Sequence, residues 1–149
     1  MENGSITGFA LIGMGPGKVE SMTLEAVEVA KNADVRLYEA YTALWPEDEL
    51  SRLEELIGPI ERIMRPTVER PEELFERAKT QSIAILVVGD PMQATTHIDF
   101  QLRAQKAGLP VRVIHGISVT TLVPGSTGLS DYKFGLSLIH ISEPTRRLN

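Results

Sequence analysis

The chain has no cysteine among its 149 residues. This absence excludes disulfide bonds, catalysis by a thiolate and metal sites built from cysteine. Its 15 lysines and arginines are outnumbered by 20 acidic residues and are scattered, so no basic patch indicates nucleic acid or an anionic membrane as a partner. No apolar run approaches the ~20 residues of a membrane helix, and residues 1–5 lack the features of a signal peptide. We therefore expect a reduced, soluble, cytoplasmic protein.

Short apolar runs alternate with helical patterns up to residue 115. The runs that indicate strands lie at 9–12, 35–39, 83–88 and 111–115, with a weaker edge strand at 60–64. The patterns that indicate helices lie at 21–32, 46–57, 71–78 and 95–107. Strands that alternate with helices favour right-handed crossovers between parallel strands. The predicted fold class is therefore α/β, a twisted parallel sheet with flanking helices.

Two of these helices have identifiable starts and apolar residues. The first begins at Pro46, with a stripe formed by Leu50, Leu53, Leu56 and Ile57. The second is capped by Thr95 or Thr96 and carries the apolar residues Ile98, Leu102 and Ala107. We expect these apolar residues to face the core.

The end of the chain departs from the pattern. Residues 136–146 resemble the peptide that a transposase sequencing adapter encodes when it is read in frame, and such scars are excluded from fold reasoning. We therefore expect residues 1–135 to be the amino-terminal α/β domain of a longer protein, and residues 136–149 to be a non-native tail. The alternative is a genuine terminal strand, because the apolar residues of this stretch suit a strand. Independent genomic sequencing separates the two.

A glycine-rich turn, Gly13-Met14-Gly15-Pro16-Gly17, follows the first strand. Its position suits a dinucleotide-binding loop, and Glu39 ends the second strand, near where an acidic residue would hold a ribose. The spacing differs from G-x-G-x-x-G, and Pro16 removes an N–H that phosphate oxygens would need. Three interpretations stay open: a nicotinamide cofactor site, a tight turn that needs small residues, and a glycine rim around a ligand without phosphate.

The buried strand at 83–88 stops abruptly at Gly89-Asp90-Pro91, and a helix pattern follows. Ligands of open α/β sheets bind beyond the carboxyl ends of the strands, so Asp90 lies where a small ligand is expected. In one role, the Asp90 side chain bonds its own backbone and closes a turn. In the other, it attracts a cation, with an interaction energy of at most ~4 kcal/mol before the cost of desolvation is deducted. The two roles are compatible.

The remaining candidates favour structural roles. No metal is expected, because no ligand-type residue stands at helical spacing beside His97. His115, at a strand end, is expected to be a hydrogen-bonded structural residue, and Trp45 to pack at the start of a helix. A hydroxyl-rich stretch lacks the His-Asp partners of a serine hydrolase; it comprises Ser118, Thr120, Thr121, Ser126 and Thr127. Three arginines are expected on a solvated face: Arg65, Arg70 and Arg77.

Several segments together resemble the diphthine synthase family, within the tetrapyrrole methylase superfamily. The segments are 11–15, 23–26, 33–42, 89–97, 113–118 and 127–135. They cover nearly all of residues 8–135. The Ala94–His97 and Tyr132–Gly135 segments distinguish this family from its sister methylases.

The resemblance implies two α/β domains with S-adenosylmethionine in the cleft between them, and a homodimer when full length. It implies methyl transfer to the amine of a modified histidine of translation elongation factor 2, without nucleic acid or membrane. The implied cofactor contacts are Pro16, Asp90, Gln93, Ser118 and Val119, with Gly13 and Gly15 lining the loop. S-adenosylmethionine has no phosphate and is cationic, which suits Pro16 and Asp90. No catalytic residue is assigned, and the group that takes the proton of the amine is left open.

Other functions stay open beside this one. They are methylation of another substrate such as a corrinoid precursor, binding of a nicotinamide dinucleotide, and a ligand-binding or assembly module without catalysis. Holding amine and methyl in attack geometry could supply ~7–11 kcal/mol, which requires both walls of the cleft. We therefore expect the 149-residue chain itself to bind S-adenosylmethionine weakly and to be inactive.

Overall fold

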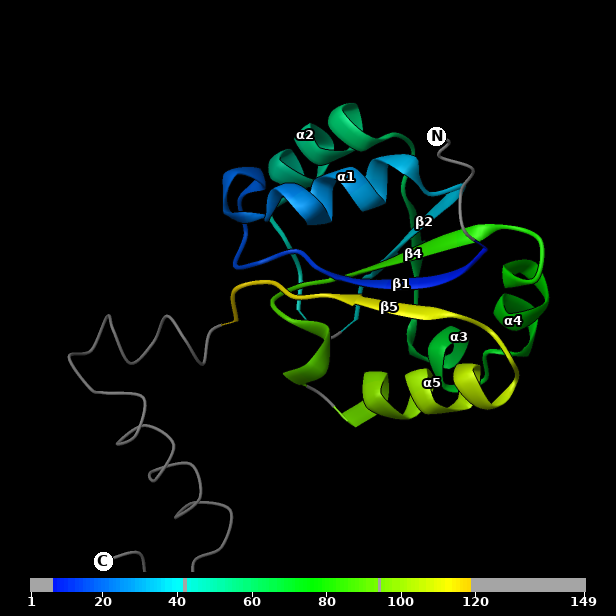
Figure 1. Cartoon of the computed structure of the whole chain (residues 1–149). Helices are drawn as coiled ribbons and strands as arrows, with labels where there is room; N and C mark the ends of the chain where they lie inside the picture. The colour runs from blue at the N-terminus through cyan, green and yellow to red at the C-terminus, as the bar shows by residue number, and fades with distance from the viewer. Residues whose placement is uncertain (1–6, 42, 94, 119–149) are drawn as a thin grey trace, which may run out of the picture. The chain divides into compact units, whose positions relative to one another are not determined.

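The computed structural model describes residues 7–41, 43–93 and 95–118 (Figure 1). Five parallel strands form one sheet in the order β3-β2-β4-β1-β5. The strands are β1 Gly8–Gly13, β2 Val35–Glu39, β3 Glu61–Ile63, β4 Ser82–Val87 and β5 Val111–Ile114. The expected α/β class and parallel sheet are confirmed, including the short edge strand β3. The chain divides into residues 1–117 and a second unit, of which Ser118 alone is described.

Helices cover both faces of the sheet (Figure 1). The α-helices are α1 Leu24–Asn32, α2 Glu47–Ile57, α3 Arg65–Glu69, α4 Glu72–Ala78 and α5 Thr95–Lys106, and the short 3-10 turns are η1 Val19–Ser21 and η2 Pro91–Gln93. α1 and α2 pack on one face, whereas α3, α4 and α5 pack on the other. Among the described residues, no helix has the length and apolarity to cross a bilayer.

The alternation of faces produces a topological switch between β1 and β4. The chain leaves β1 for the face covered by α1, and it leaves β4 for the opposite face, covered by α5. β1 and β4 are neighbours in the sheet and pair over six residues, from Gly8–Ser82 to Gly13–Val87. Open α/β sheets bind their ligands at the carboxyl ends of strands flanking such a switch. A ligand site is therefore expected at the turns after β1 and β4.

The prediction that Ile98 and Leu102 of α5 face the core is wrong. Ile98 is 40% exposed and Leu102 is 59% exposed, whereas Phe100 and Ala104 are buried. Phe100 packs edge-on against Phe9 of β1, with 4.9 Å between ring centroids. The bulky aromatic ring takes the core face, which rotates the helix away from the face that the aliphatic residues suggested. The side chains of both candidate capping threonines lie outside the described residues.

The other helices differ from the predictions at their ends. α1 begins at Leu24 rather than at residue 21, because the Thr23 side chain accepts the Ala26 N–H and caps the helix there. α2 buries most of its predicted stripe, but Leu56 is partly exposed and Pro46 precedes the helix as its cap. α3 was not predicted. Of the three arginines expected on a solvated face, Arg65 and Arg70 are exposed and Arg77 is partly buried.

Candidate functional site

The carboxyl ends of the three neighbouring strands β4, β1 and β5 meet through glycines. A Cβ atom built on Gly13 would lie 2.5 Å from the Gly116 backbone nitrogen and 2.6 Å from the Gly89 carbonyl oxygen. A Cβ built on Gly116 would lie 2.5 Å from the same carbonyl oxygen. Backbone atoms cannot withdraw as a flexible side chain can, so neither position has room for a larger residue. The tight-turn interpretation of the glycine loop is therefore confirmed at Gly13.

Gly15 joins the turn after β1 to the turn after β4. Its N–H donates to the Gly89 carbonyl over 3.2 Å, and its carbonyl accepts the Gly89 N–H over 3.0 Å. Its φ of +76° lies in the left-handed region that favours glycine. The same carbonyl accepts the indole N–H of Trp45 over 3.3 Å. Trp45 is buried, as predicted, and it also fixes the glycine turn.

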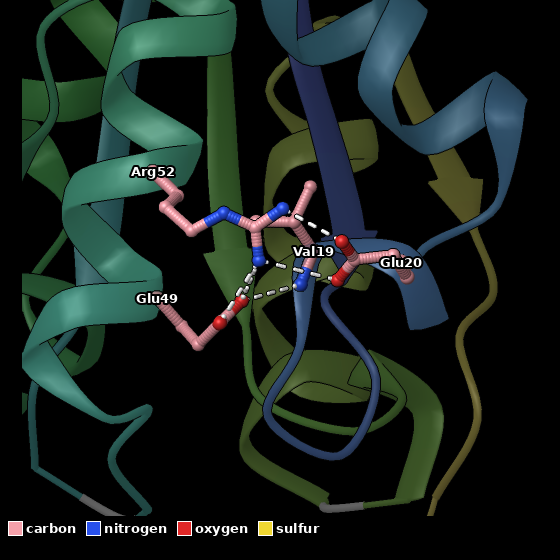
Figure 2. A network of polar contacts seen from close by, with 4 residues as sticks. All are labelled: Val19, Glu20, Glu49 and Arg52. Atoms are coloured by element: carbon pink, nitrogen blue, oxygen red, sulfur yellow. Dashed lines mark hydrogen bonds and ion pairs between the residues drawn. The ribbon is translucent and has the colours of Figure 1, made fainter.

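A network of charged side chains holds the far end of the glycine turn against α2 (Figure 2). Glu49 accepts the Val19 backbone N–H over 3.0 Å and binds the Arg52 guanidinium. Arg52 also binds Glu20 over 2.6 Å, and its hydrogen bond lowers the pKa of Glu20 from 4.5 to about 2. The turn after β1 is thus fixed by Trp45 at one end and by α2 at the other.

Asp90, the predicted site residue after β4, uses both carboxylate oxygens within the fold. Its Oδ2 accepts the Met92 N–H over 3.0 Å, which closes a turn of the kind expected for aspartate. Its Oδ1 accepts the Gly116 N–H over 2.9 Å and bonds His115 Nδ1 over 2.8 Å. The Asp90 side chain is only 8% exposed. The turn role is therefore confirmed, and the carboxylate also ties the turn after β4 to the end of β5.

A second histidine–carboxylate pair is buried at the end of β2. His97 Nε2 lies 2.6 Å from Glu39 Oε2, and these side chains are 6% and 3% exposed. Burial, followed by the nearby Glu39 carboxylate, raises the pKa of Tyr41 above its ordinary range. Because Glu39 is enclosed and bonded to His97, it is not placed to hold a ribose, which disfavours the nicotinamide interpretation. Among the described residues, no three histidine or acidic side chains form a metal-binding group.

The predicted cofactor contacts that the structure describes lie at or after the carboxyl ends of β1, β4 and β5. Pro16 follows Gly15 and is exposed, and Gln93 ends η2 with its side chain exposed. Ser118 is buried and follows Gly116 by two residues. Val119, like the hydroxyl-bearing residues 120–127, lies outside the described residues. The structure thus brings together the turns of Gly13, Gly15 and Asp90.

Sequence reasoning missed three parts of this arrangement. Gly116 was not singled out, although a glycine at or just after the end of three strands in one sheet is a signal of close backbone approach. The hydrogen bond from Trp45 to the glycine turn and the pairing of Glu39 with His97 had no local signal. Both join residues at least 30 positions apart.

Comparison with known proteins places the chain in a family. A model of a family described as tetrapyrrole (corrin/porphyrin) methylases matches residues 8–149. The chain belongs to the tetrapyrrole methylase family. Its curated relatives include the diphthine synthase of Methanosarcina mazei, 37% identical over 127 residues, and that of Archaeoglobus fulgidus, 38% identical over 128 residues. Each match covers 85% of this chain but 48% and 51% of the relative.

Solved structures show the same fold. A crystal structure titled diphthine synthase superposes with a TM-score of 0.76 at 35% identity, covering 83% of this chain and 50% of that one. A conserved hypothetical protein from Aeropyrum pernix K1 superposes with a TM-score of 0.76 at 33% identity. The match covers 86% of this chain and 45% of that one. This methylase chain therefore spans about half the length of the relatives it matches.

Proposed function

We propose that this chain is the amino-terminal part of a diphthine synthase, an enzyme that methylates the amine of a modified histidine of translation elongation factor 2. The observation that carries the proposal is the 35–38% identity to curated diphthine synthases over 83–85% of the chain. We place the complete enzyme in the cytoplasm, where its protein substrate is found, and infer that it forms a homodimer.

The turns at the carboxyl edge of the sheet fit S-adenosylmethionine as the methyl donor. Pro16 has no N–H and would contribute little to a phosphate site, but this donor has no phosphate to bind. The buried Asp90 carboxylate places a negative charge close to the edge, which favours a cation through the field it generates. Residues that would hold the donor are Gly13, Gly15, Pro16, Asp90, Gln93, Ser118 and Val119.

Asp90 has a more indirect role in this proposal than the sequence suggested. Both of its oxygens already accept backbone N–H groups, so its main task is to position the turn after β4. The donor, when bound, supplies a methyl group already activated on a sulfonium, so the protein needs no covalent nucleophile. The residues of the chain need only hold the donor and the substrate amine in line, which can contribute ~7–11 kcal/mol.

A labelled-methyl assay tests the proposal. The product of the complete reading frame containing this chain is incubated with methyl-labelled S-adenosylmethionine and elongation factor 2 that carries the modified, unmethylated histidine. We expect label to enter the elongation factor and not a corrinoid precursor supplied in parallel. Label in the corrinoid arm alone would reassign the substrate within the methylase family. Label in neither arm would contradict the proposal.

A further inference from the structure

His115 stands out at the site because a buried carboxylate orients its exposed ring. Its side chain is 70% exposed, whereas the side chain of its partner Asp90 is 8% exposed. His115 Nδ1 lies 2.8 Å from Asp90 Oδ1. Among the contacts of the described residues, none occupies Nε2. The arrangement differs from the pair formed by His97 and Glu39, in which both side chains are buried.

The hydrogen bonds of Asp90 determine which ring nitrogen of His115 carries the proton. Both carboxylate oxygens accept backbone N–H groups, from Gly116 and from Met92, and these groups can only donate. A carboxylate that serves as an acceptor at both oxygens requires Nδ1 of His115 to donate to it. The neutral ring then carries its lone pair on Nε2. This is the tautomer of a general base held by a carboxylate.

The backbone next to His115 fixes its position relative to the glycine turn. Gly116 follows His115 directly, and its N–H donates to the same Asp90 oxygen. The Gly116 backbone is also in tight contact with Gly13, since a Cβ on Gly13 would come within 2.5 Å of the Gly116 nitrogen. The ring therefore projects from a rigid junction of three strand ends, at the same edge as the proposed donor contacts.

We propose that His115 Nε2 accepts the proton of the substrate ammonium group, and that Asp90 positions the ring for this step. The inference rests on the proposed function, because methyl transfer to nitrogen requires an unprotonated amine. The ammonium N–H bond breaks and the proton moves to Nε2, while the electron pair stays on nitrogen as a lone pair. That lone pair would bond to the methyl carbon of the donor as the carbon–sulfur bond breaks, and the electrons of the broken bond would stay on sulfur, which leaves as a neutral thioether. The imidazolium is then stabilised by Asp90 and returns the proton to water, so that each transfer releases one proton.

The variant His115→Asn separates this role from a purely structural one. An asparagine amide N–H can replace Nδ1–H in the bond to Asp90, but it has no basic nitrogen in place of Nε2. We expect His115→Asn, in the complete enzyme, to bind S-adenosylmethionine within about twofold of wild type by titration. General bases contribute ~10²–10⁴-fold, so kcat should fall by ~100-fold or more. Added imidazole should partly rescue His115→Ala, and Arg112→Gln on the same strand serves as the control that retains activity.

The outcomes distinguish this inference from the proposed function. A His115→Asn enzyme that is nearly as active as an active wild type would overturn the inference and leave the function intact. A wild type that transfers no methyl group would overturn both. The tautomer of His115 gives a readout that is independent of activity. Long-range proton–nitrogen NMR spectra show which ring nitrogen carries the proton. We expect neutral His115 to carry its proton on Nδ1 and to lose this preference in Asp90→Asn; a proton on Nε2 in the wild type would contradict the inference.

Discussion

At the scale of single residues, two glycines at this edge of the sheet are required for different physical reasons. Gly15 adopts a φ of +76°, which side chains other than glycine rarely tolerate. Gly116 does not have a positive φ, but its surroundings are backbone atoms too close for a Cβ. The first requirement is local to the chain, whereas the second arises from packing between strands. A turn-forming sequence indicates the first requirement, whereas the second is indicated only by the recurrence of glycine after several strands of one sheet.

Substitution of Gly116 should therefore be costly for steric reasons. We expect Gly116→Ala to lower the free energy of unfolding by ~1–3 kcal/mol, the usual effect of overpacking, in urea denaturation of the chain. Gly108 is the matched contrast, because its φ is +81° and no atom lies within 4 Å of its missing Cβ. Asparagine tolerates this backbone better than alanine, so Gly108→Asn should be more stable than Gly108→Ala, and Gly116→Asn less stable than Gly116→Ala. The same order at both positions would refute the steric explanation.

The buried pair of His97 and Glu39 supports a second residue-scale prediction. His97→Phe removes the partner of a carboxylate that is 3% exposed, and we expect a loss of ~3–5 kcal/mol in unfolding free energy. Glu39→Gln retains a hydrogen-bonding side chain and should lower the unfolding free energy by less. A double-mutant cycle with Glu39→Met tests the coupling, because the second substitution removes the stranded carboxylate. Losses that add to within ~0.5 kcal/mol would show that the two side chains act independently.

At the scale of secondary-structure elements, α2 and α5 hold the turns of the proposed site from opposite faces of the sheet. α2 reaches the glycine turn through Glu49 and Arg52 (Figure 2), and α5 follows directly on the turn of Asp90. The position of His97 depends on the rotation of α5 about its own axis. With Phe100 facing the core, His97 lies against Glu39. An α5 rotated to bury Ile98 and Leu102 would direct His97 away from β2.

The ion pair between η1 and α2 predicts a pH dependence of stability. The pKa of Glu20 in the folded chain is about 2, below the 4.5 of the unfolded chain, because Arg52 binds the ionised form. A lowered pKa stabilises the fold above pH 4.5, and the contribution disappears as pH falls through 2. The difference in Tm between wild type and Glu20→Gln should therefore be largest above pH 4.5 and shrink toward zero near pH 2. The effect should be small, since the pair is exposed, and weaker in high salt. A constant difference across this range would contradict the assignment.

At the scale of the whole molecule, the chain provides one set of strand ends and about half the length of its relatives. Three joined turns form a rigid edge, but a small-molecule site typically encloses 70–90% of its ligand. The described residues offer contacts from one sheet edge. The remaining enclosure has to come from parts of the protein beyond those the structure describes.

The 149-residue chain should therefore bind S-adenosylmethionine weakly and transfer no methyl group. We expect isothermal titration calorimetry to give an affinity at least ~100-fold below that of the complete enzyme, equivalent to about 2.7 kcal/mol. The chain with Asp90→Ala should bind still more weakly, because the turns after β4 and β5 lose their common acceptor. Equal affinity of the chain and the complete enzyme would show that one sheet edge suffices. Labelled methyl on elongation factor 2 after incubation with the chain alone would show that it is also catalytically competent.

The sequence alone determined the five strands, four of the five α-helices that the structure describes, the α/β class and the candidate turns after β1 and β4. These features depend on local patterns, such as an apolar run that ends at glycine, and on the general rule that places ligands at the carboxyl edge of a parallel sheet. The resemblance carried by segments such as 89–97 indicated the methylase family, which the family model matches.

The tertiary structure alone decided how the candidate residues pair. Asp90 follows β4 and meets His115 after β5, on the far side of β1, whereas Glu39 at the end of β2 meets His97 of α5. These pairs join positions 25 and 58 residues apart, so only the tertiary arrangement of strands and helices brings them together. The face of α5 that is buried was likewise decided by the fit of Phe100 against Phe9. Phe100 and Ala104 stand at helical spacing, but the pattern within the helix did not favour this face over the one that carries Ile98 and Leu102. Side-chain packing selects one of several patterns that the chain permits locally, since the free energy of burial depends on the neighbours that each residue meets. For this reason the sequence located the edge of the site, and the fold determined which of its side chains are exposed there.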